Sequence, residues 1–425
     1  MLEEIETLLP GLDDVAKGID FPALCVCFDT DAAAEEIERL LTTLGARPAG
    51  RVMVHLRAVN PATYLGGGKI DEIRVQAEAL KARCIVIDAE LSPNQLRNLE
   101  KDLCKPVLDR PGVIIEIFSR HARTRESKTQ VALARMQYLL PRLAHFWDHF
   151  ERQRGGSPGS RGMGEKQIEV DRRLVQRQIS VLKGRLVEIA KERKVQRAGR
   201  KNVLKVALVG YTNAGKSTLL NALTHSKVLA EDKLFATLDS SVRALDPDAH
   251  PPVVAIDTVG FISRLPHSLI ASFRSTLEEL EQADLLVHVV DASSAQASEE
   301  LQVAEKVLED LGVGEKPRFT VLNKVDLIQG ALARNRARVV APGAHFVSAL
   351  KGDDVENLRQ AILKHFHAQL EQWDVMIPYA ESKLESQIHA HGVVETMRPM
   401  EKGLFFRIRI EPTWAKKLGL GKFRL

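Results

Sequence analysis

The chain has 425 residues, of which 44% are hydrophobic and 27% are charged, the ordinary balance of a globular protein long enough for two to four domains. Its formal net charge is +4, no apolar run approaches the roughly 18 residues of a membrane span, and the acidic start lacks the basic region of a secretion signal, so we expect a cytoplasmic protein without a membrane span. The four cysteines form no C-x-x-C pair, which favours core positions for Cys25 and Cys27 over zinc or disulfide roles.

Residues 1–118 are predicted to form an α/β domain with a largely parallel sheet. Short apolar runs predict strands at 22–28, 52–56, 84–88 and 112–118. Helical periodicity fills the stretches between them, at 31–46, 69–82 and 92–103. The sequence GGGK at 66–69 lacks the Ser or Thr of a phosphate loop, because Ile70 follows Lys69, so we expect a tight turn there rather than a second nucleotide site.

Residues 119–202 are predicted to form a helical hairpin. Apolar residues three and four positions apart make two stripes typical of coiled-coil helices: Ala132, Met136, Leu139, Leu143, Phe146 and Phe150, then Val175, Ile179, Leu182, Leu186 and Ile189. Pro141 is expected to kink the first helix. The segment 155–164 is rich in glycine and is expected to be a non-helical tip.

The hairpin is also strongly basic. Residues 119–201 hold 21 Lys and Arg residues against 8 Asp and Glu residues, which leaves a net charge of −9 for the rest of the chain. A basic segment between acidic domains favours an RNA partner, although a solvated helix face would explain the same charge. The candidate RNA contacts flank the tip: Arg152, Arg154, Arg161 and Lys166.

Residues 203–371 return to strand–helix alternation and carry GYTNAGKS, which fits the phosphate-loop pattern G-x-x-x-x-G-K-[ST]. An apolar strand precedes this motif and an amphipathic helix follows it, as such a loop requires. Lys216 can reach the β- and γ-phosphates, and Ser217 can ligate Mg²⁺. The predicted nucleotide contacts of the loop are Gly210, Tyr211, Thr212, Asn213, Ala214, Gly215, Lys216 and Ser217.

Two later segments are expected to complete the phosphate end of the site. VVAIDTVG places Asp257 where it can hold a Mg²⁺-bound water and Gly260 where its N–H can meet the γ-phosphate. LFATLDSSVR contains Thr237, which could ligate Mg²⁺ when the γ-phosphate is present. We therefore expect Ser217 and Thr237 at the metal, with Lys216, Thr237 and Gly260 serving hydrolysis. The further predicted contacts are Phe235, Ala236, Thr237, Leu238, Asp239, Asp257, Thr258, Val259 and Gly260.

The residue after Gly260 departs from the Ras-like pattern. Phe261 stands where a Gln would orient the attacking water, and an apolar side chain cannot do this. We therefore expect slow hydrolysis unless another group, a partner or an ion completes the site.

A second pair of motifs selects the base. FTVLNKVD ends in the N-K-x-D pattern, whose carboxylate, Asp326, can accept both the N1–H and the exocyclic amine of guanine. Adenine lacks that donor pair, so these motifs predict GTP rather than ATP. The expected base contacts, with those of HFVSAL, are Asn323, Lys324, Val325, Asp326, Ser348, Ala349 and Leu350.

The remaining residues, 372–425, are predicted to form a small α+β domain. A helical pattern at 381–391 precedes two strand patterns, 392–396 and 403–410. Trp373 and Pro378 mark the boundary with the preceding domain.

Outside the nucleotide motifs, the chain resembles the HflX family of ribosome-associated GTPases. RGMGEKQIEVDRR at 161–173 is similar to that family's Gly-rich loop and G-E-x-x-x-E-x-D-R-R segment, and NPATYLGGGKIDEI at 60–73 is similar to its P-x-T-x-x-G-x-G-K segment. The resemblance extends through DTVGFISRLPHSLIASFRSTLEE at 257–279. It implies an N-terminal α/β subdomain (1–118), a basic hairpin (119–202), a P-loop GTPase domain with a mixed sheet (203–371) and a small C-terminal domain (372–425).

The same resemblance implies the function and partners. HflX-like proteins bind the large ribosomal subunit and its rRNA, and couple GTP to splitting or rescue of stalled or idle ribosomes. We expect a protein that is monomeric when free and cytoplasmic, associated with ribosomes or the membrane surface. In GTPases similar to Era and TrmE, an asparagine at the position of Asn213 helps to bind K⁺, which makes K⁺ a second candidate cofactor beside Mg²⁺. Two alternatives stay open: an Era- or TrmE-like GTPase of RNA maturation, and a nucleotide-gated ribosome-binding protein with negligible turnover.

Overall fold

The computed structural model describes residues 21–28, 30–143, 161–198, 203–224, 235, 241–246, 252–264 and 279–425. These residues group into two compact units, drawn mainly from residues 1–192 and from residues 193–425. Among the described residues, no helix combines the length and the apolar character needed to span a membrane.

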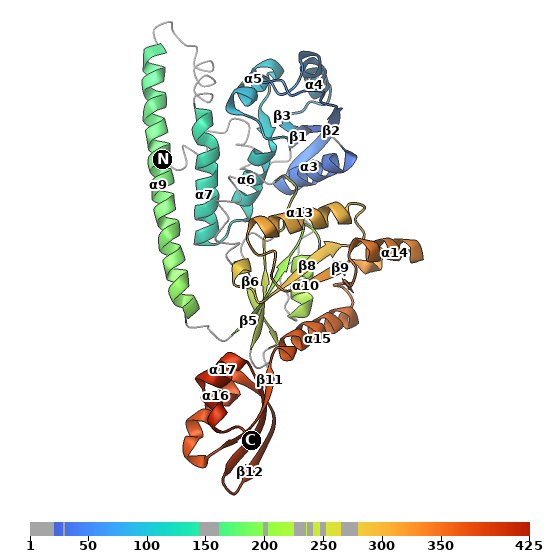
Figure 1. The fold of residues 1–425 in the computed structure, drawn as a ribbon. Helices are drawn as coiled ribbons and strands as arrows, with labels where there is room; N and C mark the ends of the chain where they lie inside the picture. Colours follow the sequence, from blue (N-terminus) through green and yellow to red (C-terminus); the bar gives the residue numbers. More distant parts are fainter. Residues whose placement is uncertain are drawn as a thin grey trace. The chain divides into compact units, whose positions relative to one another are not determined.

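The first unit contains a four-stranded parallel sheet in the order β2-β1-β3-β4 (Figure 1). Its strands are β1 (Phe21–Phe28), β2 (Ala46–Val54), β3 (Cys84–Ile87) and β4 (Val107–Asp109). The helices that connect them are α3 (Asp31–Leu44), α4 (Gly67–Ala79) and α5 (Pro93–Leu103). The predicted α/β character is confirmed. Cys25 and Cys27 lie on β1 and are buried, as expected for core residues.

The prediction of a strand at 112–118 is wrong. These residues belong to α6 (Arg110–His121), which begins with Pro111 in its first turn and is capped by Asp109, whose side chain accepts a hydrogen bond from the Gly112 N–H at 3.0 Å. All residues from Arg110 to Phe118 are buried. A helix buried on all sides shows a continuous apolar run, which periodicity cannot distinguish from a buried strand.

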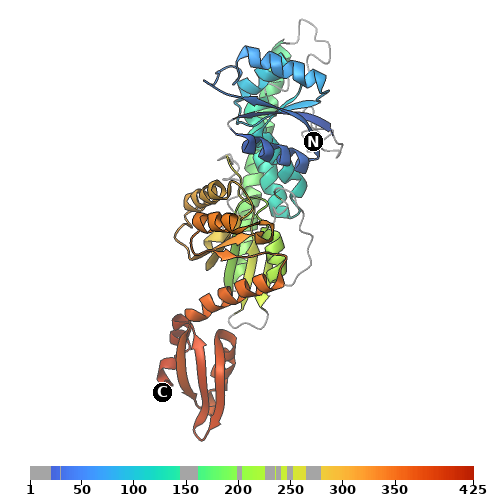
Figure 2. The ribbon, with the colours of Figure 1, turned by 90° about the vertical axis from the view of Figure 1, so that its right-hand side faces the viewer.

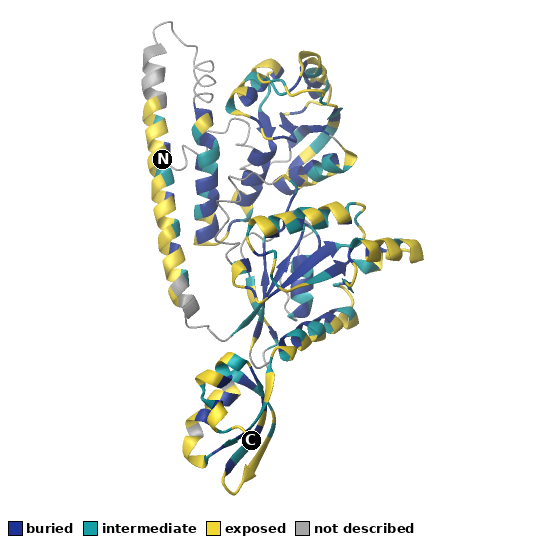
Figure 3. Ribbon diagram, in the orientation of Figure 1, coloured by how far each residue is buried: buried dark blue, intermediate teal, exposed yellow. Residues whose placement is uncertain are grey.

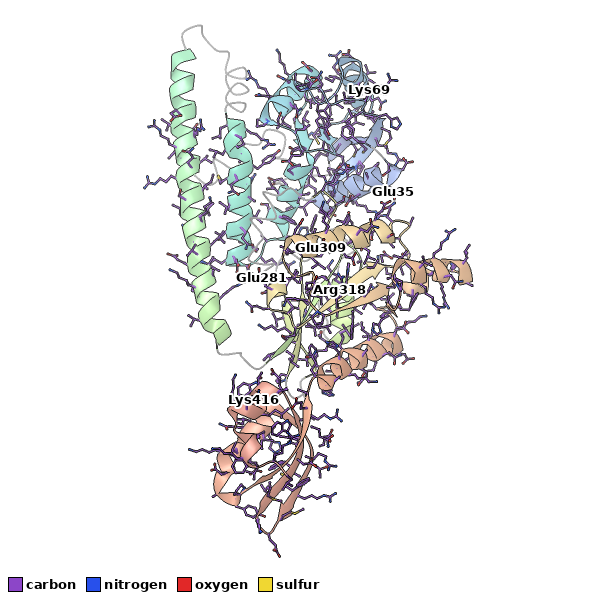
Figure 4. All side chains as sticks on the ribbon, in the orientation of Figure 1. Glu35, Lys69, Glu281, Glu309, Arg318 and Lys416 are labelled. Atoms are coloured by element: carbon purple, nitrogen blue, oxygen red, sulfur yellow. The ribbon has the colours of Figure 1, made fainter. Side chains whose placement is uncertain are left out.

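The expected tight turn at 66–69 is also wrong. Gly66 is the extended N-cap residue of α4, with a φ of −74°, and α4 begins at Gly67. The Lys69 Nζ lies 2.7 Å from Glu72 Oε2 on the same helix, at the surface (Figure 4). This segment is a helix start.

The two predicted apolar stripes pack together in the first unit. The described residues of the first stripe lie on α7 (Arg125–Leu139), except Leu143, which follows the 3-10 turn η1 (Leu140–Arg142) that contains Pro141. The second stripe lies on α9 (Arg161–Ala198). One cluster joins both stripes, from Leu133, Met136, Leu143, Val175 and Leu182. In Figure 3, α9 is exposed along most of its length, whereas α7 is largely buried.

The predicted tip of the hairpin is only partly described. Residues 144–160, with Phe146, Phe150, Arg152 and Arg154, lie outside the described residues. The prediction that 161–164 are non-helical is wrong, since α9 begins at Arg161. A glycine inside a helix costs only ~1 kcal/mol, which the rest of a long helix can offset.

The second unit is built on a six-stranded mixed sheet in the order β10-β9-β8-β5-β7-β6. The strands are β5 (Leu204–Val209), β6 (Ser241–Asp246), β7 (Val253–Asp257), β8 (Leu285–Asp291), β9 (Arg318–Asn323) and β10 (His345–Phe346), of which β6 runs antiparallel to β7 and the other pairs are parallel. The helices are α10 (Lys216–Leu223), α13 (Ala297–Asp310), α14 (Ala331–Val340) and α15 (Gly352–Ala368). Since the parallel strands end at one edge, the segments that follow them converge there.

The C-terminal residues, drawn in red in Figure 2, form a three-stranded antiparallel sheet in the order β11-β13-β12. Its elements are β11 (Glu371–Ile377), α16 (Ser382–His391), β12 (Gly392–Met400), β13 (Gly403–Ile410) and α17 (Pro412–Lys417). The two predicted strands and the helix are present. The strand β11 was missed, because the predicted domain boundary falls inside it.

Candidate functional site

The phosphate loop connects β5 to α10 and has the backbone that its glycines predict. Gly210 and Gly215 have φ angles of +143° and +87°, and a Cβ on Gly210 would lie 2.1 Å from the Val289 carbonyl oxygen. Only glycine fits that close approach. Asn213 also has a left-handed φ, of 61°.

Lys216 is held over this loop by two backbone carbonyls. Its ammonium donates to the Gly210 oxygen at 3.0 Å and to the Tyr211 oxygen at 2.7 Å, and the residue is only 6% exposed. Burial lowers the pKa of Lys216 to about 8, and the negative charge of Asp257 partly opposes that shift. The ammonium is therefore placed where phosphate oxygens would both bind it and restore its preference for the charged form.

Ser217 and Asp257 come together at the same edge. The Ser217 hydroxyl donates to Asp257 Oδ2 at 2.7 Å, because β5 and β7 are parallel neighbours and both end there. A hydroxyl and a carboxylate are hard oxygen ligands, which fit Mg²⁺. Thr258 has a structural contact, its hydroxyl donating to the Leu208 carbonyl at 2.6 Å.

The residues after Asp257 lie directly against the loop. The Thr212 N–H donates to the Phe261 oxygen at 2.7 Å, and the Phe261 N–H donates to the Gly210 oxygen at 3.0 Å. A Cβ on Gly260 would lie 2.9 Å from Lys216 Nζ, so the backbone of Gly260 is close to the ammonium. Phe261 itself is 3% exposed and belongs to the core.

The guanine motifs form one hydrogen-bonded network. Asn323 donates from Nδ2 to the Ala214 oxygen at 2.9 Å and accepts the Ala349 N–H on Oδ1 at 3.1 Å. The Ser348 hydroxyl donates to Asp326 Oδ1 at 2.6 Å. Asn323 thereby joins the phosphate loop to the segment after β10, and Ser348 orients the carboxylate that would read the base.

Two carboxylates in this network were missed by sequence reasoning. Asp291, at the end of β8, lies 2.7 Å from Lys324 Nζ, and Asp354, in the first turn of α15, accepts the Ser348 N–H at 3.0 Å. The signal for Asp291 was available, because a carboxylate at the end of a parallel strand lies at the ligand-binding edge. No motif pointed to Asp354.

The structure brings most of the predicted contacts together at this edge. Phe235 belongs to the first unit, where its ring packs edge-on against Phe118 with centroids 4.7 Å apart. Arg161 and Lys166 lie on α9, and their contact with RNA stays a prediction. The predicted contacts Ala236, Thr237, Leu238 and Asp239 lie outside the described residues, so their roles stay predictions. The residues that the second unit gathers are Gly210, Tyr211, Thr212, Asn213, Ala214, Gly215, Lys216, Ser217, Asp257, Thr258, Val259, Gly260, Asn323, Lys324, Val325, Asp326, Ser348, Ala349 and Leu350.

Comparison with known proteins gives matches along most of the chain. Three family models match consecutive regions: GTP-binding GTPase N-terminal at 31–119, GTP-binding GTPase Middle Region at 121–200 and 50S ribosome-binding GTPase at 205–324. A curated protein named GTPase HflX from Magnetococcus marinus is 41% identical over 382 residues, 89% of this chain and 88% of that protein.

A second protein named GTPase HflX, from Escherichia coli, is 40% identical over 365 residues, 85% of each chain. Among solved structures, a GTP-binding protein from the archaeon Sulfolobus solfataricus in complex with GDP is 25% identical, with a TM-score of 0.43, and the match covers 81% of this chain and 98% of that one.

Proposed function

The chain belongs to the HflX family of GTPases and hydrolyses GTP, and from this premise we propose that it binds the large ribosomal subunit in the cytoplasm and couples the GTP cycle to splitting or rescue of stalled or idle ribosomes. The observation that carries the proposal is the match of residues 205–324 to the family described as 50S ribosome-binding GTPase. The basic character of residues 119–201 supports an rRNA contact, because neutralised phosphates contribute affinity that does not depend on sequence.

The geometry suggests how the site handles GTP. Lys216 would bind the β- and γ-phosphates from its place over the loop, and the Gly260 N–H would meet the γ-phosphate. Ser217 would ligate Mg²⁺ and Asp257 would hold a water bound to it, and the ion neutralises charge on the phosphates when bound. Asp326, oriented by Ser348, would accept the guanine N–H groups.

One part of the usual machinery is absent from this group of described residues. Phe261 is buried in the core and cannot orient a water at the γ-phosphate. A residue or ion from elsewhere must therefore position the attacking water, and we propose that the ribosome brings this about. K⁺ bound through Asn213 stays a prediction.

The proposal is tested by GTP turnover of the full chain with and without purified large subunits. We expect stimulation of about a hundredfold, the effect of completing one missing catalytic interaction. Small subunits serve as the control and should have little effect. Absence of stimulation together with tight binding to a precursor RNA would favour the maturation alternative, and GTP binding without turnover in any condition would favour the nucleotide-gated binding protein.

A further inference from the structure

Among the described residues, residues 261–263 are attached to the beginning of the phosphate loop by hydrogen bonds that include the following three. Two of them join backbone atoms of Phe261 to Gly210 and Thr212, so they do not depend on the identity of a side chain. The third needs a particular side chain, because the Ser263 N–H donates to the phenol oxygen of Tyr211 at 2.7 Å. These two residues are 52 positions apart in the chain.

This attachment sets the position of Gly260. Its neighbour Phe261 is bonded to the loop through both its N–H and its carbonyl, and Ile262 is 1% exposed. A Cβ on Gly260 would lie 2.8 Å from Thr212 Cγ2 and 2.9 Å from Lys216 Nζ. The backbone of Gly260 therefore lies close to the ammonium, and the hydrogen bonds of Phe261 restrain it there.

We propose that the Tyr211 hydroxyl is a positioning group for GTP hydrolysis: it keeps the segment after Gly260 attached to the phosphate loop, so that the Gly260 N–H stays where the γ-phosphate binds. Tyr211 belongs to the phosphate loop, whereas its hydroxyl accepts a hydrogen bond from Ser263, in the segment that follows Gly260. GDP has no γ-phosphate and makes no use of the Gly260 N–H, so the hydroxyl should matter for GTP and not for GDP.

The test is Tyr211→Phe, which removes the hydroxyl and keeps the ring. Two quantities are measured on the full chain without ribosomes: kcat/KM for GTP, and the equilibrium affinity for a fluorescent GDP analogue. We expect kcat/KM to fall about fivefold, the effect of one neutral hydrogen bond, while GDP affinity is unchanged. The assay contains no ribosomes, so its outcome does not depend on the proposed ribosomal function.

A matched control is Tyr379→Phe. Its hydroxyl donates to the Met400 carbonyl at 2.9 Å in the C-terminal part of the chain, and removing it should change neither quantity. Three outcomes would overturn the proposal: kcat/KM unchanged in Tyr211→Phe, kcat/KM increased, or equal losses for GTP and GDP, since equal losses would mean that the hydroxyl only maintains the loop.

Discussion

Lys216 is a buried ammonium whose charge depends on what occupies the phosphate loop. Without nucleotide, burial lowers its pKa to about 8, so above that pH the side chain is largely neutral in the free protein. Bound phosphates favour the charged form and raise the pKa again. Nucleotide binding is therefore linked to proton uptake in a window that begins near pH 8.

We predict that GDP binding at pH 8.5 takes up about 0.8 proton, the neutral fraction expected for a group with a pKa of about 8, and almost none at pH 7. Calorimetric titrations in buffers of different ionisation enthalpy measure this number. Lys216→Arg is the control, because a guanidinium stays charged and should abolish the uptake. A proton count that does not change with pH would contradict the assignment.

At the scale of elements, Asp109 connects the end of β4 to α6 and η1. Its carboxylate caps α6 through Gly112, accepts the Tyr138 hydroxyl at 2.7 Å and pairs with Arg142 at 3.2 Å. Burial raises the pKa of Asp109, and the Arg142 charge and these hydrogen bonds counteract the shift. One side chain thus explains why the chain turns into a helix at 110 where an apolar run alone suggested a strand.

Asp109→Ala should destabilise the first unit by about 3–5 kcal/mol, because it removes the cap and leaves the Arg142 guanidinium buried without its carboxylate. The measurement is urea denaturation of the full chain. Thr30→Ala is the matched control: Thr30 is an exposed N-cap that accepts the Ala33 N–H at 3.3 Å, and its loss should cost about 1 kcal/mol. Equal effects of the two substitutions would show that the buried pair contributes little.

At the scale of the whole molecule, the proposed ribosomal action depends on the basic hairpin and on the GTPase site together. Apolar residues of the two stripes form one cluster, so the two segments of the hairpin pack against each other. The candidate RNA contacts Arg152 and Arg154 precede the start of α9 at Arg161. Both lie outside the described residues, so their contact with RNA stays a prediction.

Arg152→Gln with Arg154→Gln should weaken binding to large subunits and reduce the slope of log affinity against log salt by about 1.5, as expected for two lost phosphate contacts. GTP turnover without ribosomes should be unchanged. Arg334→Gln with Arg336→Gln removes the same charge from exposed positions of α14 and serves as the control. If both pairs reduce the slope equally, net charge rather than the hairpin accounts for the affinity.

The sequence by itself determined the nucleotide chemistry and most elements. The phosphate loop and the N-K-x-D segment could be located because each is a short motif at the end of an apolar strand, and parallel strands place such ends at one edge. The same local reasoning located β5, β7, β9 and β13, and the stripes of α7 and α9. A local pattern is sufficient to predict an element or a motif when all the residues that define it lie in one short segment.

Tertiary structure alone decided the contacts that complete the site. Asn323 reaches the Ala214 carbonyl across 109 positions, Ser348 orients Asp326, and Tyr211 binds Ser263. These contacts depend on the order of the strands and on the path of each loop, and a short sequence pattern predicts neither. Burial on all sides also hid the helix at 112–118 from sequence analysis, because an enclosed segment lacks the periodicity that would have identified it.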